Sequence, residues 1–194
     1  MKTDIILAGV GGQGILSIAA VIGTAALLDN LQIKQSEVHG MSQRGGAVQS
    51  HLRISDTIVY SDIIAVGTAD IIIGVEPMEA IRYMPFLSGN GWVVTNSKPF
   101  INITNYPESE LLLDEIKKIP NHIIIEADDI AKELQSPKSS NIVMLGAASL
   151  HIKIPFESLE NGIKSIFGRK GPEIVAINLE ALRRGRKAAQ AYTR

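Results

Sequence analysis

The residues whose types and spacing are best suited to chemistry lie in a glycine-rich segment near the start of the chain. Gly9, Gly11 and Gly14 match the pattern G-x-G-x-x-G, directly after an apolar run and before a helix-forming stretch. In a dinucleotide site, these glycines permit a tight turn, let backbone amides approach a phosphate, and let helix and strand pack closely. Glu37, 23 residues beyond Gly14, stands where such a site places an acid for the ribose hydroxyl.

An alternative is that these glycines only allow a buried apolar helix to pack on a sheet, with Glu37 as a half-exposed strand residue. Gly12 and Gln13 favour this alternative, because they place a bulky amide where the loop would accept a diphosphate. The polar segment that follows Glu37 also replaces the usual return from helix to strand. We therefore do not predict a dehydrogenase, and a stand-alone nucleotide-binding oxidoreductase stays open as the alternative.

A second segment, EVHGMSQRGG, combines an acid, an imidazole, a guanidinium and three glycines, a composition typical of a site or contact loop. Arg44, followed by Gly45 and Gly46, is the best candidate for an anion ligand, because a guanidinium offers a planar fork to carboxylate or phosphate. A pairing of Arg44 with Glu37 is an equally open alternative. His39 is a candidate for a position near substrate, although hydrogen bonding within the loop is its simpler role.

Composition excludes several other chemistries. The 194 residues include no cysteine, so this chain cannot supply thiolates to an iron–sulfur cluster or form disulfides. The four histidines show no i, i+4 pair and no acidic cluster, so we expect no metal site. The formal charge of -1 argues against a nucleic-acid or membrane-surface partner, and the basic residues after Lys164 are expected on a solvated or subunit-facing helix. The first residues lack a secretory signal, so we expect a cytoplasmic protein.

Apolar periodicity predicts the elements that position these residues, and an apolar content of 45% is ample for a core. We expect a single domain, residues 1–194, with an α/β fold: a Rossmann-like layered sheet, mostly parallel, with helices on both faces and a helical C-terminal region. The expected strands cover residues 3–8, 32–38, 47–54, 58–60, 69–75, 91–95 and 122–126. The expected helices cover residues 13–28, 77–87, 108–118, 128–134, 141–151, 155–167 and 172–192. Asp128 is the expected cap of its helix, and Glu76 is expected to cap a helix or brace a loop.

Four ordered segments are more specific than the glycine pattern alone. They read AGVGGQGI (8–15), EVHGMSQRGG (37–46), GVEPMEA (74–80) and NIVMLGA (141–147). Together they resemble the gamma-type subunit of 2-oxoacid:ferredoxin oxidoreductases, and most of all the beta subunit of the indolepyruvate:ferredoxin oxidoreductases. The resemblance covers nearly the whole chain.

The resemblance implies a non-autonomous subunit of an enzyme that oxidatively decarboxylates indolepyruvate and other aryl pyruvates with coenzyme A. The products would be an aryl-acetyl-CoA, carbon dioxide and reduced ferredoxin. It further implies that thiamine diphosphate and the iron–sulfur clusters belong to a large partner subunit, which agrees with the absence of cysteine here. The chain should then be inactive alone and meet ferredoxin only through the complex, and in isolation it could pair as a homodimer through surfaces that the partner normally covers.

Two roles stay open for the two loops. In the first, the loop of residues 9–14 and Arg44 bind an anionic part of coenzyme A at the subunit interface. In the second, the same loops form a scaffold surface that completes the large subunit's active site without a ligand of its own.

Overall fold

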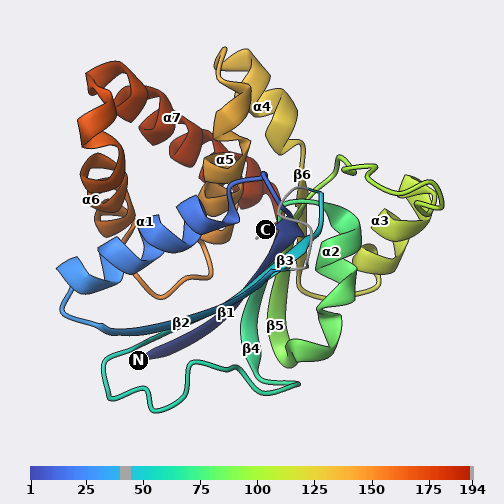
Figure 1. The fold of residues 1–194 in the computed structure, drawn as a ribbon, viewed down its shortest axis with the longest axis horizontal. Coiled ribbons are helices and arrows are strands. Elements are labelled where there is room, and N and C mark those ends of the chain that lie inside the picture. The colour runs from blue at the N-terminus through green and yellow to red at the C-terminus, as the bar shows by residue number, and fades with distance from the viewer. Residues whose placement is uncertain (40–44, 193–194) are drawn as a thin grey trace.

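The computed structural model describes residues 1–39 and 45–192, which form one six-stranded sheet with helices on both faces (Figure 1). The strands follow the spatial order β2-β3-β1-β4-β5-β6. Their bounds are β1 Lys2–Val10, β2 Gln32–His39, β3 Ala47–Ser55, β4 Ala69–Gly74, β5 Leu87–Asn96 and β6 His122–Ile125. β1, β4, β5 and β6 pair in parallel, whereas β3 runs antiparallel to both of its neighbours, β1 and β2. The prediction of a mostly parallel α/β sheet is therefore confirmed.

Five helices cover one face of the sheet and two cover the other (Figure 1). The first group comprises α1 Ile15–Leu28, α4 Ala127–Glu133, α5 Ser140–Ala148, α6 Phe156–Phe167 and α7 Pro172–Ala189. The second group comprises α2 Pro77–Arg82 and α3 Ser109–Lys117. Because successive side chains of a strand point to opposite faces, Ile5 and Leu7 join the first core while Ile6 joins the second.

Two glycines let α5 and α7 approach each other closely. A Cβ on Gly146 would lie 2.1 Å from the carbonyl oxygen of Leu182, and one on Gly185 would lie 1.9 Å from that of Val143. Since real Cβ atoms do not approach backbone this closely, both positions need glycine. The C-terminal helical region is thus packed on the sheet through a contact of helix backbones.

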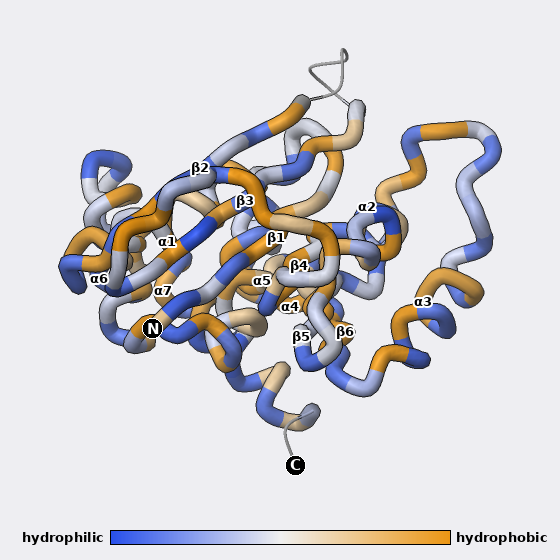
Figure 2. The backbone as a smooth tube through the Cα atoms, turned by 90° about the horizontal axis from the view of Figure 1, so that it is seen from below, coloured by the Kyte–Doolittle hydropathy of each residue, from blue (hydrophilic) through white to orange (hydrophobic). Residues whose placement is uncertain are grey.

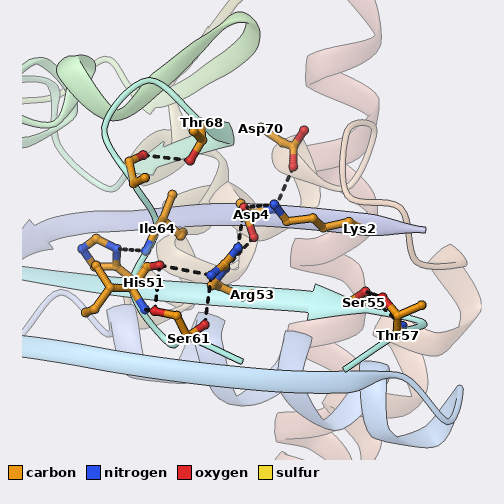
Figure 3. A network of polar contacts seen from close by, with 12 residues as sticks. Lys2, Asp4, His51, Arg53, Ser55, Thr57, Ser61, Ile64, Thr68 and Asp70 are labelled. Atoms are coloured by element: carbon orange, nitrogen blue, oxygen red, sulfur yellow. Dashed lines mark hydrogen bonds and ion pairs between the residues drawn. The ribbon is translucent and has the colours of Figure 1, made fainter. Parts of the chain in front are cut away.

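A polar network lies on the second face of the sheet (Figure 3). The carboxylate of Asp4 is fully buried and accepts hydrogen bonds from Arg53 Nε at 2.9 Å and Nη2 at 3.2 Å. His51 Nδ1 accepts the amide of Ile64 at 3.0 Å. The alternation predicted for β3 is therefore confirmed, and its polar side meets the segment of residues 56–68 as well as its neighbouring strand.

Three details of the predicted elements were wrong. Residues 58–60 form no strand; Lys34 Nζ donates to Tyr60 O, and just beyond this stretch Arg53 Nη1 donates to Ser61 O. The helix predicted over residues 77–87 ends at Arg82, and a short 3-10 turn over Met84–Phe86 follows it.

The third error concerns the start of α4. Asp128 does not cap this helix, since it lies within the first turn and Glu126 occupies the capping position. The first amide, that of Ala127, donates instead to Asn96 Oδ1 at 3.0 Å, and Asn96 Nδ2 donates to Asp128 at 3.2 Å. No helix within the described residues is both long and apolar enough to cross a bilayer.

Candidate functional site

The candidate site lies where the parallel strands end. β1 leads into α1 on one face of the sheet and β4 leads into α2 on the other, so the chain leaves these adjacent strands in opposite directions. In open α/β sheets the crevice at such a switch point is the usual place for a ligand. The glycine loop, residues 9–14, closes this crevice at the end of β1.

Packing accounts for two of the loop's glycines. A Cβ on Gly9 would lie 2.2 Å from Val75 Cγ2, across the junction between β1 and β4. Gly14 has a φ of +78°, and a Cβ on Gly14 would lie 2.4 Å from Asn141 Nδ2. The same Asn141 nitrogen donates to Gly14 O at 2.9 Å, which ties α5 to the start of α1. Both glycines therefore serve the contact of strand and helices.

The amides of the glycine loop are largely engaged within the chain. Val10 N donates to Gln13 Oε1 at 2.8 Å, and Gln13 N donates to Val10 O at 3.1 Å. Gly11 N donates to Gly46 O at 2.8 Å. A dinucleotide site of this type needs such amides for a diphosphate. The bulky Gln13 thus turns inward and takes up a donor that a nucleotide would use.

The glycine loop is bound to the end of the second loop. Gly45, with a φ of +77°, donates to Gly11 O at 3.4 Å, which complements the bond from Gly11 to Gly46. Asn102 Nδ2 donates to Gly45 O at 2.7 Å, so the long connection between β5 and α3 reaches the same place. The structure thereby brings the two predicted segments together.

Of the remaining predicted site residues, the structure describes Glu37 and His39 but not Arg44. Glu37 lies in β2 opposite Ser50 of β3, and His39 ends β2 opposite Val48. Arg44 lies outside the described residues, as does the rest of residues 40–44, so its role stays a prediction.

Three cavities adjoin the glycine loop. A cavity of about 300 Å³ is lined by Val10, Gly11, Gly12, Gly14, Ile15, Leu16, Glu37 and Val48. A smaller one of about 190 Å³ is lined by Gln13, Val75, Asn96, Phe100, Ala127, Asp128, Ser140, Asn141 and Met144. A groove of about 600 Å³ extends over the start of α1 to α7, and its lining includes Gly12, Gln13, Ser17, Lys138, Asn141 and Lys170.

Only the groove has basic side chains among the described residues that line these three cavities. Lys138 and Lys170 lie with serine hydroxyls beside the first turn of α1, whose amides favour negative charge. A groove of this volume and lining fits an anionic ligand. By contrast, the described residues that line the two other cavities include one carboxylate each, Glu37 or Asp128, and no lysine or arginine.

A buried acid braces the crevice from β4. Glu76 is fully buried, and its Oε1 accepts the amide of Glu79 at 2.5 Å, which confirms the predicted capping role. Its Oε2 accepts the hydroxyl of Tyr106 at 2.6 Å. Burial, followed by the bond to Glu76, raises the pKa of Tyr106 above its ordinary value. Burial likewise raises the pKa of Glu79, against the effect of the nearby Arg82 guanidinium.

Sequence reasoning missed Asn102, Tyr106, Lys138 and Lys170. The first two lie in an aperiodic connection, and the lysines are single charges in surface segments. Asn141 alone had a signal, because it begins the fourth of the ordered segments. The described residues hold no group of three histidine or acidic side chains that could bind a metal. This arrangement can shape a site and bind a ligand, and among the described residues none of the three cavity linings combines a carboxylate with a histidine, lysine or arginine that could act as an acid–base pair.

Comparison with known proteins agrees with this geometry. Residues 4–188 match the family model described as pyruvate ferredoxin/flavodoxin oxidoreductase. The chain is 37% identical to indolepyruvate oxidoreductase subunit IorB of Archaeoglobus fulgidus, over 95% of this chain and 94% of that protein.

Two solved structures share the fold. The gamma subunit of a keto/oxoacid ferredoxin oxidoreductase from Geobacter sulfurreducens is 25% identical, with a TM-score of 0.71 over 97% of this chain and 99% of that one. The 2-oxoglutarate:ferredoxin oxidoreductase of Magnetococcus marinus, solved with 2-oxoglutarate, coenzyme A and succinyl-CoA, is 26% identical with a TM-score of 0.77. That match covers 98% of this chain but only 31% of the longer one. This chain therefore belongs to the pyruvate ferredoxin/flavodoxin oxidoreductase family.

Proposed function

We propose that this chain is the small, non-autonomous subunit of a ferredoxin-dependent enzyme that oxidatively decarboxylates indolepyruvate and related aryl pyruvates with coenzyme A. The observation that supports this role best is the engagement of the loop amides: Val10, Gly11 and Gln13 all donate within the chain. A nucleotide-binding oxidoreductase would leave such amides free for its cofactor. A preformed loop surface suits a chain that completes a site held elsewhere.

The chemistry is assigned to the partner. Thiamine diphosphate would supply the carbanion chemistry and iron–sulfur clusters would carry the electrons, and both would belong to the large subunit. This chain has no cysteine with which to hold a cluster. The single-domain organisation and the cytoplasmic compartment remain part of the proposal.

The chain's own residues would contribute in two ways. On the side of the 600 Å³ groove, Lys138 and Lys170 would receive anionic groups of coenzyme A beside the start of α1. On the other side, the joined loops at Gly11 and Gly46 would form a rigid wall against the large subunit. We thus assign ligand binding to the groove side of the glycine loop and contact with the large subunit to its other side.

The substrate class follows the relative from Archaeoglobus fulgidus, whose name states indolepyruvate. The co-expressed complex should be assayed for coenzyme A-dependent ferredoxin reduction with indolepyruvate, phenylpyruvate, pyruvate and 2-oxoglutarate. We expect the highest kcat/KM for the two aryl substrates. A higher kcat/KM for 2-oxoglutarate or pyruvate would overturn the substrate assignment. Micromolar binding of NAD(P) or a flavin by the isolated chain would instead favour the stand-alone oxidoreductase.

A further inference from the structure

The connection between β5 and α3, residues 97–108, exposes large apolar side chains beside the candidate site. Ile101 is 72% exposed, Phe100 43% and Ile103 42%. Hydrophobic stretches are visible along this outlying segment between α2 and α3 (Figure 2). The segment has only two charged residues, Lys98 and Glu108. An apolar surface depleted of charge is typical of the centre of a protein interface.

Polar tethers hold this apolar segment in place at three points. Near its start, Lys98 forms an ion pair with Asp129 of α4. In its middle, Asn102 Nδ2 donates to Gly45 O at 2.7 Å, and near its end Tyr106 donates to the buried Glu76 at 2.6 Å. Exposed apolar side chains therefore project from a backbone that is already ordered. Such preorganisation lowers the entropic cost of binding a partner.

The apolar surface continues from this segment around the glycine loop. Phe100 lines the 190 Å³ cavity together with Gln13, and the half-exposed Leu16 lines the 300 Å³ cavity on the other side of the loop. The bond from Asn102 to Gly45, and the bond from Gly45 to Gly11, connect the segment to the loop directly. A protein that covered residues 100–103 would therefore lie against the proposed site.

We propose that residues 97–108, through Phe100, Ile101 and Ile103, form the docking surface for the large partner subunit. This inference rests on the proposed function and names the surface by which the partner reaches the site. The large subunit is favoured over a second copy of this chain because the surface is continuous with the proposed shared site. In the Magnetococcus marinus enzyme, moreover, the matching fold occupies 31% of a longer chain, so there it is joined to a larger body of protein. The matching patch on the partner should be apolar and weakly charged.

A second apolar segment supplies matched controls. Residues 56–68 expose Ile58 at 67% and Val66 at 68%, close to the exposure of Ile101. This segment connects the end of β3 to the start of β4, at the opposite end of the central strands from the glycine loop. Substituting serine in either segment removes a similar exposed side chain, so only the location differs.

The test measures the affinity of the full-length chain for its purified, cofactor-loaded large subunit by biolayer interferometry. Ile101→Ser and Ile103→Ser should each weaken binding by roughly tenfold or more, whereas Ile58→Ser and Val66→Ser should leave it within about twofold. Hydrogen exchange on the unmodified complex provides a second measurement, in which amides of residues 100–106 should slow on binding while those of residues 58–66 do not.

Three results would overturn the inference. Unchanged affinity in both Ile101→Ser and Ile103→Ser, with protection absent from residues 100–106, would reject this surface. Weakening confined to Ile58→Ser or Val66→Ser would place docking at the opposite end of the strands. Concentration-dependent dimers of the isolated chain that Ile101→Ser abolishes, without any change in affinity for the large subunit, would assign the surface to a second copy. Failure of the unmodified chain to bind the large subunit at all would reject the proposed function itself.

Discussion

The amide of Gly11 donates to the carbonyl oxygen of Gly46 over 2.8 Å, and this bond joins the two glycine-bearing loops at the end of the parallel strands. The segments lie far apart in the sequence, yet each resembles the same enzyme family. Their contact means that a change in one loop is transmitted to the other. The joined loops form the wall on which the proposed function depends.

Removal of the Tyr106 hydroxyl should destabilise the crevice. In Tyr106→Phe, the buried Oε2 of Glu76 loses its donor, and we expect the free energy of unfolding to fall by about 1–3 kcal/mol in urea titrations. The pKa of Tyr106 is raised in the folded state, so its contribution is complete below the unfolded value near pH 10 and is lost only above it. The difference between the two proteins should therefore stay constant from pH 6 to 9. A difference that vanished within this range would contradict the bond.

His51 should make stability depend on pH. Burial lowers its pKa, and Arg53 lowers it further while Asp62 opposes them. Because the folded pKa lies below the unfolded value of about 6.5, stability is complete above that value and falls as the pH drops through it. Urea unfolding at pH 7.5 and 5.5 should show a smaller loss for His51→Gln than for the unmodified chain.

The control for this pH effect is His151, whose pKa burial also lowers. His151→Phe preserves the stack on Trp92, where the ring centroids lie 3.7 Å apart, and removes only the second titration. In His151→Phe, the free energy of unfolding should still fall between pH 7.5 and 5.5 by the amount that is due to His51. Equal pH dependence in all three proteins would contradict the assignment to either imidazole.

The α5–α7 contact should not tolerate a methyl group. Gly146→Ala and Gly185→Ala each place a Cβ against backbone, and we expect losses of about 1–3 kcal/mol in the free energy of unfolding. Gly168→Ala is the matched control, because a Cβ there meets nothing within 4 Å. That control should be neutral or stabilising by less than about 1 kcal/mol. Equal stability of all three variants would show that the helices separate more easily than their packing implies.

The lysines of the groove should affect coenzyme A more than the 2-oxo acid. In the reconstituted enzyme, Lys138→Ala and Lys170→Ala should each raise the KM for coenzyme A by about three- to tenfold with a small change in kcat, since each removes one contact to an anionic group. Lys117→Ala, on the outer surface of α3, should change neither constant. Arg44→Ala tests the remaining candidate in the same assay. Unchanged KM values in Lys138→Ala, Lys170→Ala and Arg44→Ala would leave the loops as a contact surface alone.

Local patterns were enough to predict most of the fold. The apolar runs of β1, β4 and β6, the alternation in β3 and the glycine turn before α1 depend on neighbouring residues, and these predictions were confirmed. The errors arose where a hydrogen bond from a side chain distant in the sequence determined the structure. Asn96 took the place of an Asp128 cap, and Lys34 binds the carbonyl of Tyr60 at the end of the stretch predicted as a strand.

The candidate site was only partly predictable for the same reason. The sequence marked the two loops through their glycines, but the engagement of the Gly11 amide depends on Gly46, which only the folded chain brings into contact. Asn102 and Tyr106 act through single hydrogen bonds from an aperiodic connection. No local pattern of residues predicts such contacts, because they depend on the order of the strands in the sheet.

The central claim is that this chain completes an enzyme whose cofactors lie in the large subunit. It is tested most directly by the rate of indolepyruvate-dependent ferredoxin reduction by the purified large subunit, with coenzyme A, in the presence and absence of this chain. We expect negligible turnover by either protein alone and saturable activity as this chain is added. Equal rates with and without the chain would contradict it.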